Sequence, residues 1–509
     1  MADYLLGLDV GTTNTKAVLI NGEGEEAARA ERKHEVQFLS GGRVEQDAEK
    51  IWWSEFASIA RELLSSSGIS PSDIAGIGIS AMGANLTAID ETGVPLRPGI
   101  LYGVDTRAHI EIDHMNETSG AEKILETGAM ALSSQSVGPK ILWIKNNEPD
   151  VYERTYTFLT TNGYIVRKLT GRNCMDGSSA AFYGPFYDYR SNRWSEEMCE
   201  LFGIERKKLP EIVDAHEVIG EVTAEAAAEC GLKAGTPVIA GSIDTYAEAV
   251  GGGAVEPGEV FTVYGSTMSM LANAEKITPE PILWATPHYP PELYTLIGSM
   301  STSGNLIAWF FDRIVEPDKS VSGQFGEVLG HYNREAEKIA PGSEGLVALP
   351  YFSGERTPIN DPHARGVVAG LTLSHNRYHI YRALLEAIAF GFKHHLDLFS
   401  DRNVTIARII SSGGGVRNSL WAQIISDVSG FPQKCVDTGG YTAPLGNCIM
   451  AGYAVGLFDV SRAKEDFPFR LTREIRPDMK KKKEYDKLFP LYRKLYLDTA
   501  DTVHNLARF

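Results

Sequence analysis

The stretch Asp9-Val-Gly-Thr-Thr-Asn-Thr-Lys16, with Tyr264-Gly-Ser-Thr-Met-Ser269 about half the chain further on, decides the expected fold. Each is a turn of glycine and hydroxyl residues, and the first lies between the apolar runs 4–8 and 17–20. A turn of this kind points backbone N–H groups and hydroxyls at one spot, which suits an anion such as a phosphate chain. Two such turns predict a duplicated fold that holds a nucleotide between its halves.

Common phosphate-binding motifs do not explain the first turn. A P-loop needs a second glycine before its lysine, a Ser or Thr directly after the lysine, and then a helix. The segment from Gly11 to Lys16 has none of these and runs into a strand-like stretch. The Rossmann pattern is also absent. Two ordinary β-hairpins are the alternative interpretation. Asp9 favours the phosphate site, because a carboxylate beside phosphates makes sense mainly with a divalent metal between them.

The composition limits the classes of function. The 509 residues include 49 Lys or Arg and 66 Asp or Glu, which gives a formal net charge of −17. This charge argues against nucleic acid or an anionic membrane as the main partner. The length predicts two or three domains, and no apolar run reaches transmembrane length. The five cysteines form no CxxC pair, so we expect reduced core thiols in a cytoplasmic protein.

Predicted strands alternate with helices along the chain, which indicates an α/β fold. Residues 74–79, 237–240 and 408–410 are typical of buried strands, and residues 378–399 have helical spacing of apolar residues. A third glycine cluster, Gly413-Gly-Gly-Val-Arg-Asn418, follows the last of these strands and precedes a helix. Its glycines allow a flat group such as adenine to lie against the backbone. The run 251–253, three glycines, is a candidate hinge between domains.

At these residues the chain resembles the FGGY carbohydrate kinases of the actin-like ATPase superfamily, nearly from end to end. The branch that it resembles most is the xylulokinase-like one. Besides the three glycine segments, blocks similar to those of the family occur in order and at similar spacing: Val44-Glu-Gln-Asp47, Trp52-Trp53, Pro95-Leu-Arg-Pro98, Pro139-Lys-Ile-Leu-Trp143 and Pro350-Tyr-Phe-Ser-Gly-Glu-Arg-Thr-Pro358.

The resemblance implies an α/β fold with two ribonuclease-H-like domains and a central cleft that binds ATP and Mg²⁺. We expect an N-terminal domain over residues 1–250, with the sugar side, the first phosphate turn and the catalytic Asp. We expect a C-terminal domain over residues 251–509, with the second turn and the nucleoside site. The implied reaction is phosphorylation of a primary hydroxyl on a sugar or polyol, most simply a ketopentose such as xylulose. A homodimer is left open.

The segment Ala240-Gly-Ser-Ile-Asp244, at the end of a predicted strand, resembles the family segment whose Asp is the general base. Phosphoryl transfer needs an aligned hydroxyl, charge neutralisation and a proton acceptor. We therefore assign Asp244 as the base and Asp9 as the holder of metal-bound water. A strand-end or capping Asp is the alternative for Asp244 alone. By the resemblance, the nucleotide would contact Gly11, Thr12, Thr13, Lys16, Gly265, Ser266, Thr267, Gly304, Gly414 and Asn418.

The sugar side departs from the xylulokinase pattern. Where xylulokinases have Gln-Met-His-Gly, this chain has Met82-Gly-Ala-Asn85, and Tyr102-Gly-Val-Asp-Thr-Arg107 resembles Trp-x-Asp-x-Arg with one extra residue. Thr245 stands where xylulokinases carry Asn. Buried polar contacts discriminate strongly between substrates, so another ketose, a polyol, an aldonate or glycerol remain alternatives to D-xylulose. A further departure is the predicted loop Tyr441-Thr-Ala-Pro-Leu-Gly446, which lacks an acidic residue. The residues expected at the substrate are Gly83, Ala84, Asp105, Arg107, Asp244 and Thr245.

A non-enzymatic ATP-dependent switch of the same superfamily is the rival from another class. The glycine segments would serve it equally well. A switch has no need of sugar-side groups such as Asp105 with Arg107 or Glu355 with Arg356, and these favour the kinase. A degenerate kinase without turnover is a third alternative, but Asp9, Asp244 and both turns are intact.

Overall fold

The computed structural model describes residues 3–290, 292–315, 325–465 and 467–508. Its chain divides into two compact units. The first unit takes residues 1–256, 275–295 and 441–471, and the second takes residues 257–274, 296–440 and 472–509. The boundary between residues 250 and 251 stays a prediction.

The core of the first unit is a mixed sheet. Its strands lie in the order β14-β15-β6-β1-β2-β3, and β16 also pairs with β6. β2 is antiparallel to β1 and β3, whereas β6 is parallel to β1 and β15. The bounds are β1 Tyr4–Val10, β2 Asn14–Asn21, β3 Glu26–Lys33, β6 Ile74–Ala81, β14 Val218–Glu221, β15 Pro237–Ile239 and β16 Ser242–Ile243.

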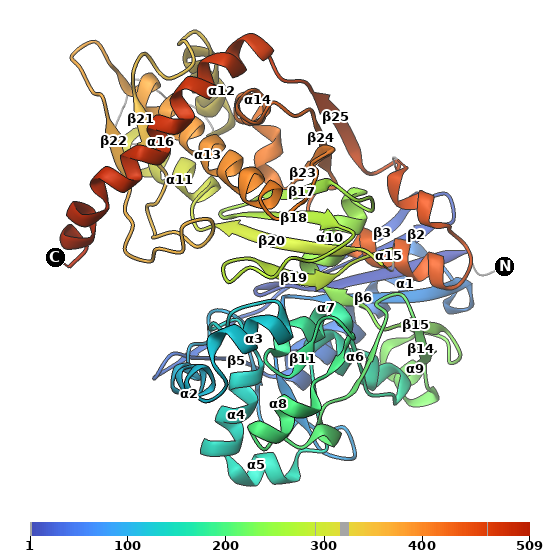
Figure 1. Ribbon diagram of the computed structural model, residues 1–509. Coiled ribbons are helices and arrows are strands. Elements are labelled where there is room, and N and C mark those ends of the chain that lie inside the picture. Colours follow the sequence, from blue (N-terminus) through green and yellow to red (C-terminus); the bar gives the residue numbers. More distant parts are fainter. Residues whose placement is uncertain (1–2, 291, 316–324, 466, 509) are drawn as a thin grey trace. The chain divides into compact units, whose positions relative to one another are not determined.

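Two helices, α10 (Asp244–Gly252) and α15 (Thr442–Ala454), pack closely against each other beside strands β1 and β6 of this sheet. Helix α15 comes from the last fifth of the chain and packs on β1 and β6 and against α10 (Figure 1). A Cβ at Gly7 of β1 would lie 1.9 Å from the Pro444 carbonyl oxygen of α15, so only glycine permits this approach. The close packing fixes the helix whose first residue is Asp244.

The remaining elements of the first unit form smaller sheets and helices around this core. The short strands are β4 Gln37–Leu39, β5 Arg43–Gln46, β7 Thr87–Ile89, β8 Gly99–Ile100, β9 Thr157–Leu159, β10 Cys174–Asp176, β11 Tyr187–Asp188, β12 Arg193–Trp194 and β13 Glu211–Val213. Strand β19 (Trp284–Pro287) belongs to none of these smaller sheets and stands next to β20 in its strand order. The helices are α1 Ser54–Ser67, α2 His109–Ser119, α3 Ala121–Gly128, α4 Gly138–Asn147, α5 Pro149–Arg154, α6 Thr161–Thr170, α7 Gly177–Ala180, α8 Glu196–Leu201 and α9 Ala224–Cys230.

The sheet of the second unit repeats the topology of the first. Its strands include the order β20-β18-β17-β23-β24-β25. The hairpin β17–β18 matches β1–β2, and β23 is parallel to both β17 and β24, as β6 is to β1 and β15. The predicted duplication of the α/β fold is thereby confirmed. The bounds are β17 Glu259–Tyr264, β18 Met268–Ala274, β20 Tyr294–Met300, β23 Arg408–Ser412, β24 Gln433–Asp437 and β25 Leu471–Ile475.

Helices α13, α14 and α16 of the second unit pack against one another (Figure 1). Helix α13 confirms the helix predicted over residues 378–399, and β6, β15 and β23 confirm the three predicted strands. The remaining bounds are α11 Gly304–Phe310, α12 Phe325–Glu337, α13 Arg377–Ser400, α14 Ser419–Ser429, α16 Met479–Leu506, β21 Val347–Leu349 and β22 Val367–Ala369.

Two predicted irregular segments are helical instead. Of residues 441–446, expected as a loop, Tyr441 is the N-cap residue of α15 and residues 442–446 form its start, where Pro444 and Gly446 are buried. The glycine run 251–253 ends α10, and a Cβ at Gly251 would lie 2.0 Å from the Thr442 carbonyl oxygen. These glycines and the proline therefore serve close helix packing, which sequence pattern alone does not distinguish from a loop.

The cysteines and the helices agree with two further expectations from sequence. All five cysteines are buried and free of disulfide bonds, as predicted. No helix in the described part of the chain is both long enough and apolar enough to cross a bilayer.

Candidate active site

The first phosphate turn, residues 11–13, connects β1 to β2. The Gly11 N–H donates to the Asn14 carbonyl oxygen at 2.9 Å and closes the turn. Its carbonyl oxygens are held from within the unit: His34 Nε2 lies 3.1 Å from those of Gly11 and Thr12, and Gln46 Nε2 donates to that of Thr12 at 3.0 Å. Bonds on the carbonyl side fix the backbone orientation of the turn, a role for His34 that sequence reasoning did not find.

The second turn, residues 265–267, is held in a similar way by the start of α11. The N–H groups of Ser303 and Asn305 each donate to the Ser266 carbonyl oxygen at 3.1 Å, and that of Gly304 donates to the Gly265 carbonyl oxygen at 2.9 Å. A Cβ at Gly304 would lie 2.5 Å from that same oxygen. The predicted nucleotide residue Gly304 thus contacts the turn itself.

The third glycine cluster lies beside the second turn. A Cβ at Gly413, whose φ is +91°, would lie 2.9 Å from the carbonyl oxygen of Tyr264, the last residue of β17. A Cβ at Gly414 would meet no atom within 4 Å, so its backbone borders open space. Asn418 caps α14 by accepting the Trp421 N–H at 3.1 Å and donates to the Tyr381 hydroxyl at 3.1 Å. The strand, glycine turn and helix predicted here are confirmed.

In the first unit, Asp9 is oriented by two polar side chains that sequence reasoning missed. Asp9 lies in β1, and its Oδ1 accepts the Ser80 hydroxyl of β6 at 2.7 Å. Asn447 Nδ2, from α15, donates to Ser80 Oγ and to the Leu8 carbonyl oxygen, both at 2.8 Å. These three residues are more than 60 positions apart in the chain, so only the fold reveals the arrangement.

Asp9 and Asp244 form an electrostatically linked pair. Burial raises the pKa of Asp9 to about 6, against the opposing effects of the Ser80 hydrogen bond and the charge of Lys16. Burial, followed by repulsion from Asp9, raises the pKa of Asp244 to about 7. Lys16 is the strand partner of Asp9 across the β1–β2 hairpin, and its ammonium lies 5.6 Å from the Tyr441 ring centroid. The structure therefore brings Asp9 within electrostatic reach of both Lys16 and Asp244.

A third carboxylate, Glu248, belongs to the same group and was not predicted. It lies one helical turn after Asp244 on α10, and residues four apart share one face of a helix. Burial first, and then the charges of Asp244 and Asp9, raise its pKa to about 8. The four-residue spacing of Asp244 and Glu248 would have indicated this pair if a helix had been predicted over these residues.

The predicted sugar residues Asp105 and Arg107 pair with each other. Arg107 Nη2 lies 2.7 Å from Asp105 Oδ2 and from Glu45 Oε1. Arg107 is 4% exposed, and its Nη1 is buried without a hydrogen-bond partner among the described residues. Buried Lys140 donates to the Leu101 carbonyl oxygen at 2.8 Å and has a pKa lowered by burial to about 7. An unpaired guanidinium N–H is a candidate donor to a ligand oxygen.

Residues 82–85, in which a substrate contact was predicted, are buried in the first unit. Ala84 is 1% exposed and belongs to the apolar core of the unit. A Cβ at Gly83 would lie 3.2 Å from the Tyr102 ring. Asn85 donates from Nδ2 to the Thr161 hydroxyl and accepts the Tyr102 N–H, both at 2.9 Å. Thr245 follows Asp244 and is partly exposed.

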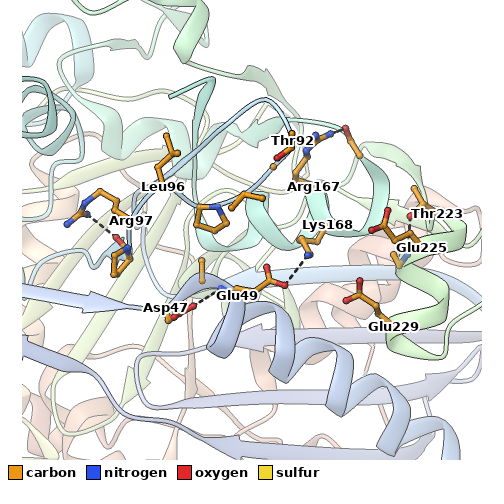
Figure 2. Close-up of a pocket in the computed structure, with 17 residues that line it drawn as sticks. Asp47, Glu49, Thr92, Leu96, Arg97, Arg167, Lys168, Thr223, Glu225 and Glu229 are labelled. Carbon is orange, nitrogen blue, oxygen red and sulfur yellow. Dashed lines mark hydrogen bonds and ion pairs between the residues drawn. The ribbon is translucent and has the colours of Figure 1, made fainter. Parts of the chain in front are cut away.

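A surface cavity of about 820 Å³ lies elsewhere in the first unit, lined by both acidic and basic side chains (Figure 2). None of the predicted catalytic, nucleotide or sugar residues lines it. Its Lys168 pairs with Glu49 at 3.1 Å and lies over the Trp53 ring, and Arg167 donates to backbone carbonyl groups. Because these cations are already engaged, we do not place the reaction there.

Comparisons with known proteins agree along the whole chain. The N-terminal domain model of the FGGY family of carbohydrate kinases matches residues 4–251, and the C-terminal domain model matches residues 261–455. The xylulose kinase of Bacillus subtilis is 29% identical over 98% of this chain and 97% of its own length. The glycerol kinase of Nocardia farcinica is 31% identical over 90% of this chain and 91% of its own length. A crystal structure of xylulose kinase from Rhodospirillum rubrum has a TM-score of 0.89 at 30% identity, covering 98% of this chain and 100% of that one.

Proposed function

Because this chain belongs to the FGGY family of carbohydrate kinases, we propose that it transfers the γ-phosphoryl group of ATP to a primary hydroxyl of a five-carbon ketose such as xylulose. The observation that carries the proposal is the partly buried pair of Asp9 and Asp244, of which Asp9 directly precedes the first predicted phosphate turn. Membership in a family of kinases makes a non-enzymatic switch the weaker explanation for the two turns.

Asp244 is the proposed general base. A base works best when its pKa lies near the operating pH, and burial brings that of Asp244 to about 7. Its position as the first residue of α10, held by close packing against α15, limits its movement. In the proposed step, Asp244 accepts the proton of the sugar hydroxyl as that oxygen attacks the γ-phosphorus and the bond to the ADP oxygen breaks.

The first unit has a donor set that fits Mg²⁺. Asp9 and Asp244 are partly buried, and the charge of Asp9 adds to the cost of ionising Asp244, which a divalent cation would offset. Mg²⁺ prefers oxygen ligands and usually keeps several waters, so an ion held by few protein oxygens, water and phosphate would suit this pair. Asp9 would hold metal-bound water, and Mg²⁺ would neutralise the phosphate charge.

Nucleotide residues are proposed for each unit. In the first unit, the phosphate residues are Gly11, Thr12, Thr13 and Lys16. In the second unit, the phosphate residues are Gly265, Ser266 and Thr267, and the nucleoside residues are Gly304, Gly414 and Asn418. Two observations support this assignment. Hydrogen-bond donors of the same unit hold the carbonyl oxygens of each turn, and the backbone of Gly414 borders open space.

Sugar recognition is proposed for Asp105, Arg107, Asp244 and Thr245. The buried, unpartnered Nη1 of Arg107 supports this assignment, since a sugar oxygen would satisfy it. Gly83 and Ala84 would contribute through backbone groups only, because the Ala84 side chain is in the core. Similarity to xylulose kinases favours a ketopentose, and the glycerol kinase relative keeps polyols as the second candidate.

A screen with purified protein tests the proposal. ADP release from Mg-ATP would be followed with D-xylulose, other ketopentoses, xylitol, gluconate and glycerol, and the product identified by phosphorus NMR. We expect the highest kcat/KM with a ketopentose, and phosphorylation at a primary hydroxyl. Asp244→Asn is the inactive control, and Asp113→Asn, on exposed α2, is the matched control with unchanged activity. No sugar-dependent ADP release with any substrate would contradict the proposal.

A further inference from the structure

Glu355 is a buried carboxylate of the second unit that the proposed site does not use. It is 4% exposed, and its Oε1 accepts the backbone N–H groups of Ser301 at 2.6 Å and of Arg356 at 2.8 Å. Its Oε2 is also buried and has no hydrogen-bond partner within the described ranges. Burial raises the pKa of Glu355 to about 7, against the opposing effects of the two backbone donors, the Ser301 side chain and the charge of Arg356. Although predicted on the sugar side, this carboxylate faces the backbone.

Ser301 lies where β20 passes into α11, a segment of residues 301–305 that we call the junction. The N–H groups of residues 303–305 hold the carbonyl oxygens of Gly265 and Ser266 at 2.9–3.1 Å. Glu355 therefore holds the junction at Ser301, two residues before Ser303, the first junction residue that bonds to the second turn.

Neighbouring residues hold the strand on either side of Ser301. Thr357 Oγ1 accepts the Ser299 N–H at 2.6 Å and lies 2.7 Å from His395 Nε2. The Thr302 hydroxyl donates to the Pro350 carbonyl oxygen. Segment 350–357 thus holds the backbone N–H groups of Ser299 and Ser301 and the side chain of Thr302. Among these contacts only that of Glu355 is made by an acid, whose hydrogen bonds are stronger when it is ionised.

We propose that Glu355 is a positioning residue for the nucleotide phosphates, acting through the junction on the carbonyl side of residues 265–267. With that side fixed, the N–H groups and hydroxyls of the turn keep one orientation toward the phosphates. A displacement of about 1 Å in such a contact is enough to lower nucleotide affinity strongly. The inference rests on the proposed function, because it takes the turn to be a phosphate site.

Three substitutions of Glu355 test the inference by steady-state kinetics. Glu355→Ala removes both backbone contacts and should raise KM for ATP by about tenfold or more, with kcat and KM for the sugar within about twofold. Glu355→Asp keeps the charge but is one methylene shorter, and should raise KM for ATP about fivefold. Glu355→Gln keeps an acceptor oxygen and should stay within about threefold of wild type.

Glu386→Ala is the matched control. Glu386 is also a buried glutamate of the second unit, but it bonds Arg382 and Ser343 and makes no hydrogen bond to the junction or the turn. It should not change KM for ATP selectively. The inference is overturned if Glu355→Ala has a wild-type KM for ATP. If the alanine variant does not fold, the same result with Glu355→Asp overturns it. It is equally overturned if KM for the sugar and KM for ATP rise together in the Glu355 variants to the same extent as in Glu386→Ala.

Hydrogen exchange without nucleotide separates this inference from the proposed function. Glu355→Asp should speed amide exchange at least about threefold in peptides covering residues 299–305 and 263–268, and leave residues 408–418 unchanged. Faster exchange in a protein that does not bind ATP would mean that the proposed function fails while Glu355 still orders the turn. Unchanged exchange in both peptides would overturn the inference even if the wild type is an active kinase.

Discussion

Replacing Asp244 by Asn should abolish most activity and at the same time stabilise the protein. The amide has the shape of the carboxyl group, and its oxygen can still accept the Thr245 N–H bond seen at 2.7 Å. Loss of the general base should lower kcat about a hundredfold or more, with little change in ATP affinity. Stability should rise because a costly buried charge is removed.

The size of the stability gain follows from the pKa. Burial and Asp9 raise the pKa of Asp244 from 3.8 to about 7, so the folded protein binds this proton more tightly than the unfolded chain. Ionisation therefore costs folding free energy that is absent well below pH 4, grows between about pH 4 and 7, and reaches about 4 kcal/mol above pH 7. Since Asp244 keeps some contact with solvent, we expect Asn to recover about 2 kcal/mol at pH 8.

Urea unfolding without Mg²⁺ or nucleotide measures this gain. Asp244→Asn should be more stable than wild type by about 2 kcal/mol at pH 8 and by less than about 1 kcal/mol at pH 5. Asp113→Asn, an exposed control, should show no such difference. The reasoning is refuted if Asp244→Asn keeps near wild-type kcat with sugar saturating, or if its stability difference does not depend on pH.

Three further substitutions test separate contacts. Gly304→Ala places a Cβ 2.5 Å from the Gly265 carbonyl oxygen and should raise KM for ATP about tenfold; an unchanged KM would show that the turn can shift freely. Arg107→Ala leaves buried Asp105 without its main partner and should lower the unfolding free energy by about 3–5 kcal/mol, and a loss below about 1 kcal/mol would argue against a tight pair. Ala84→His should cost about 1–3 kcal/mol through overpacking, whereas unchanged stability with an altered sugar preference would indicate open space at that position.

Sequence reasoning reached those proposed site residues whose arrangement is local in the chain. Asp9 and Lys16 face each other because a short glycine turn joins their strands, and a two-strand hairpin fixes such a pair by itself. Asp244 was recognisable from its strand-end segment and the family resemblance. Glu248 is equally close to Asp244 in the chain, but its place beside Asp244 could be recognised only with a helix prediction for residues 244–252. The glycine run at the end of that segment did not suggest a helix.

The long-range contacts could not be read from the sequence. Ser80 and Asn447, which orient Asp9, and His34, which holds the first turn, come from separate elements whose approach depends on packing. Segment 441–446 was expected to be a loop, and its proline and glycine are residues common in turns. In the folded protein they allow α15 to approach β1 and α10 closely.

The sequence by itself determined the α/β class and the duplicated hairpin with its glycine turn, and together with the family resemblance it proposed Asp9 and Asp244 for the site. These features depend on local patterns: apolar runs, turn residues and short motifs in a fixed order. Tertiary structure alone decided which polar groups hold the turns from behind and how deeply the carboxyl groups are buried, and with that their pKa values near neutrality. Burial and hydrogen bonding between distant segments are properties of the packed chain, because they depend on which surfaces exclude water together.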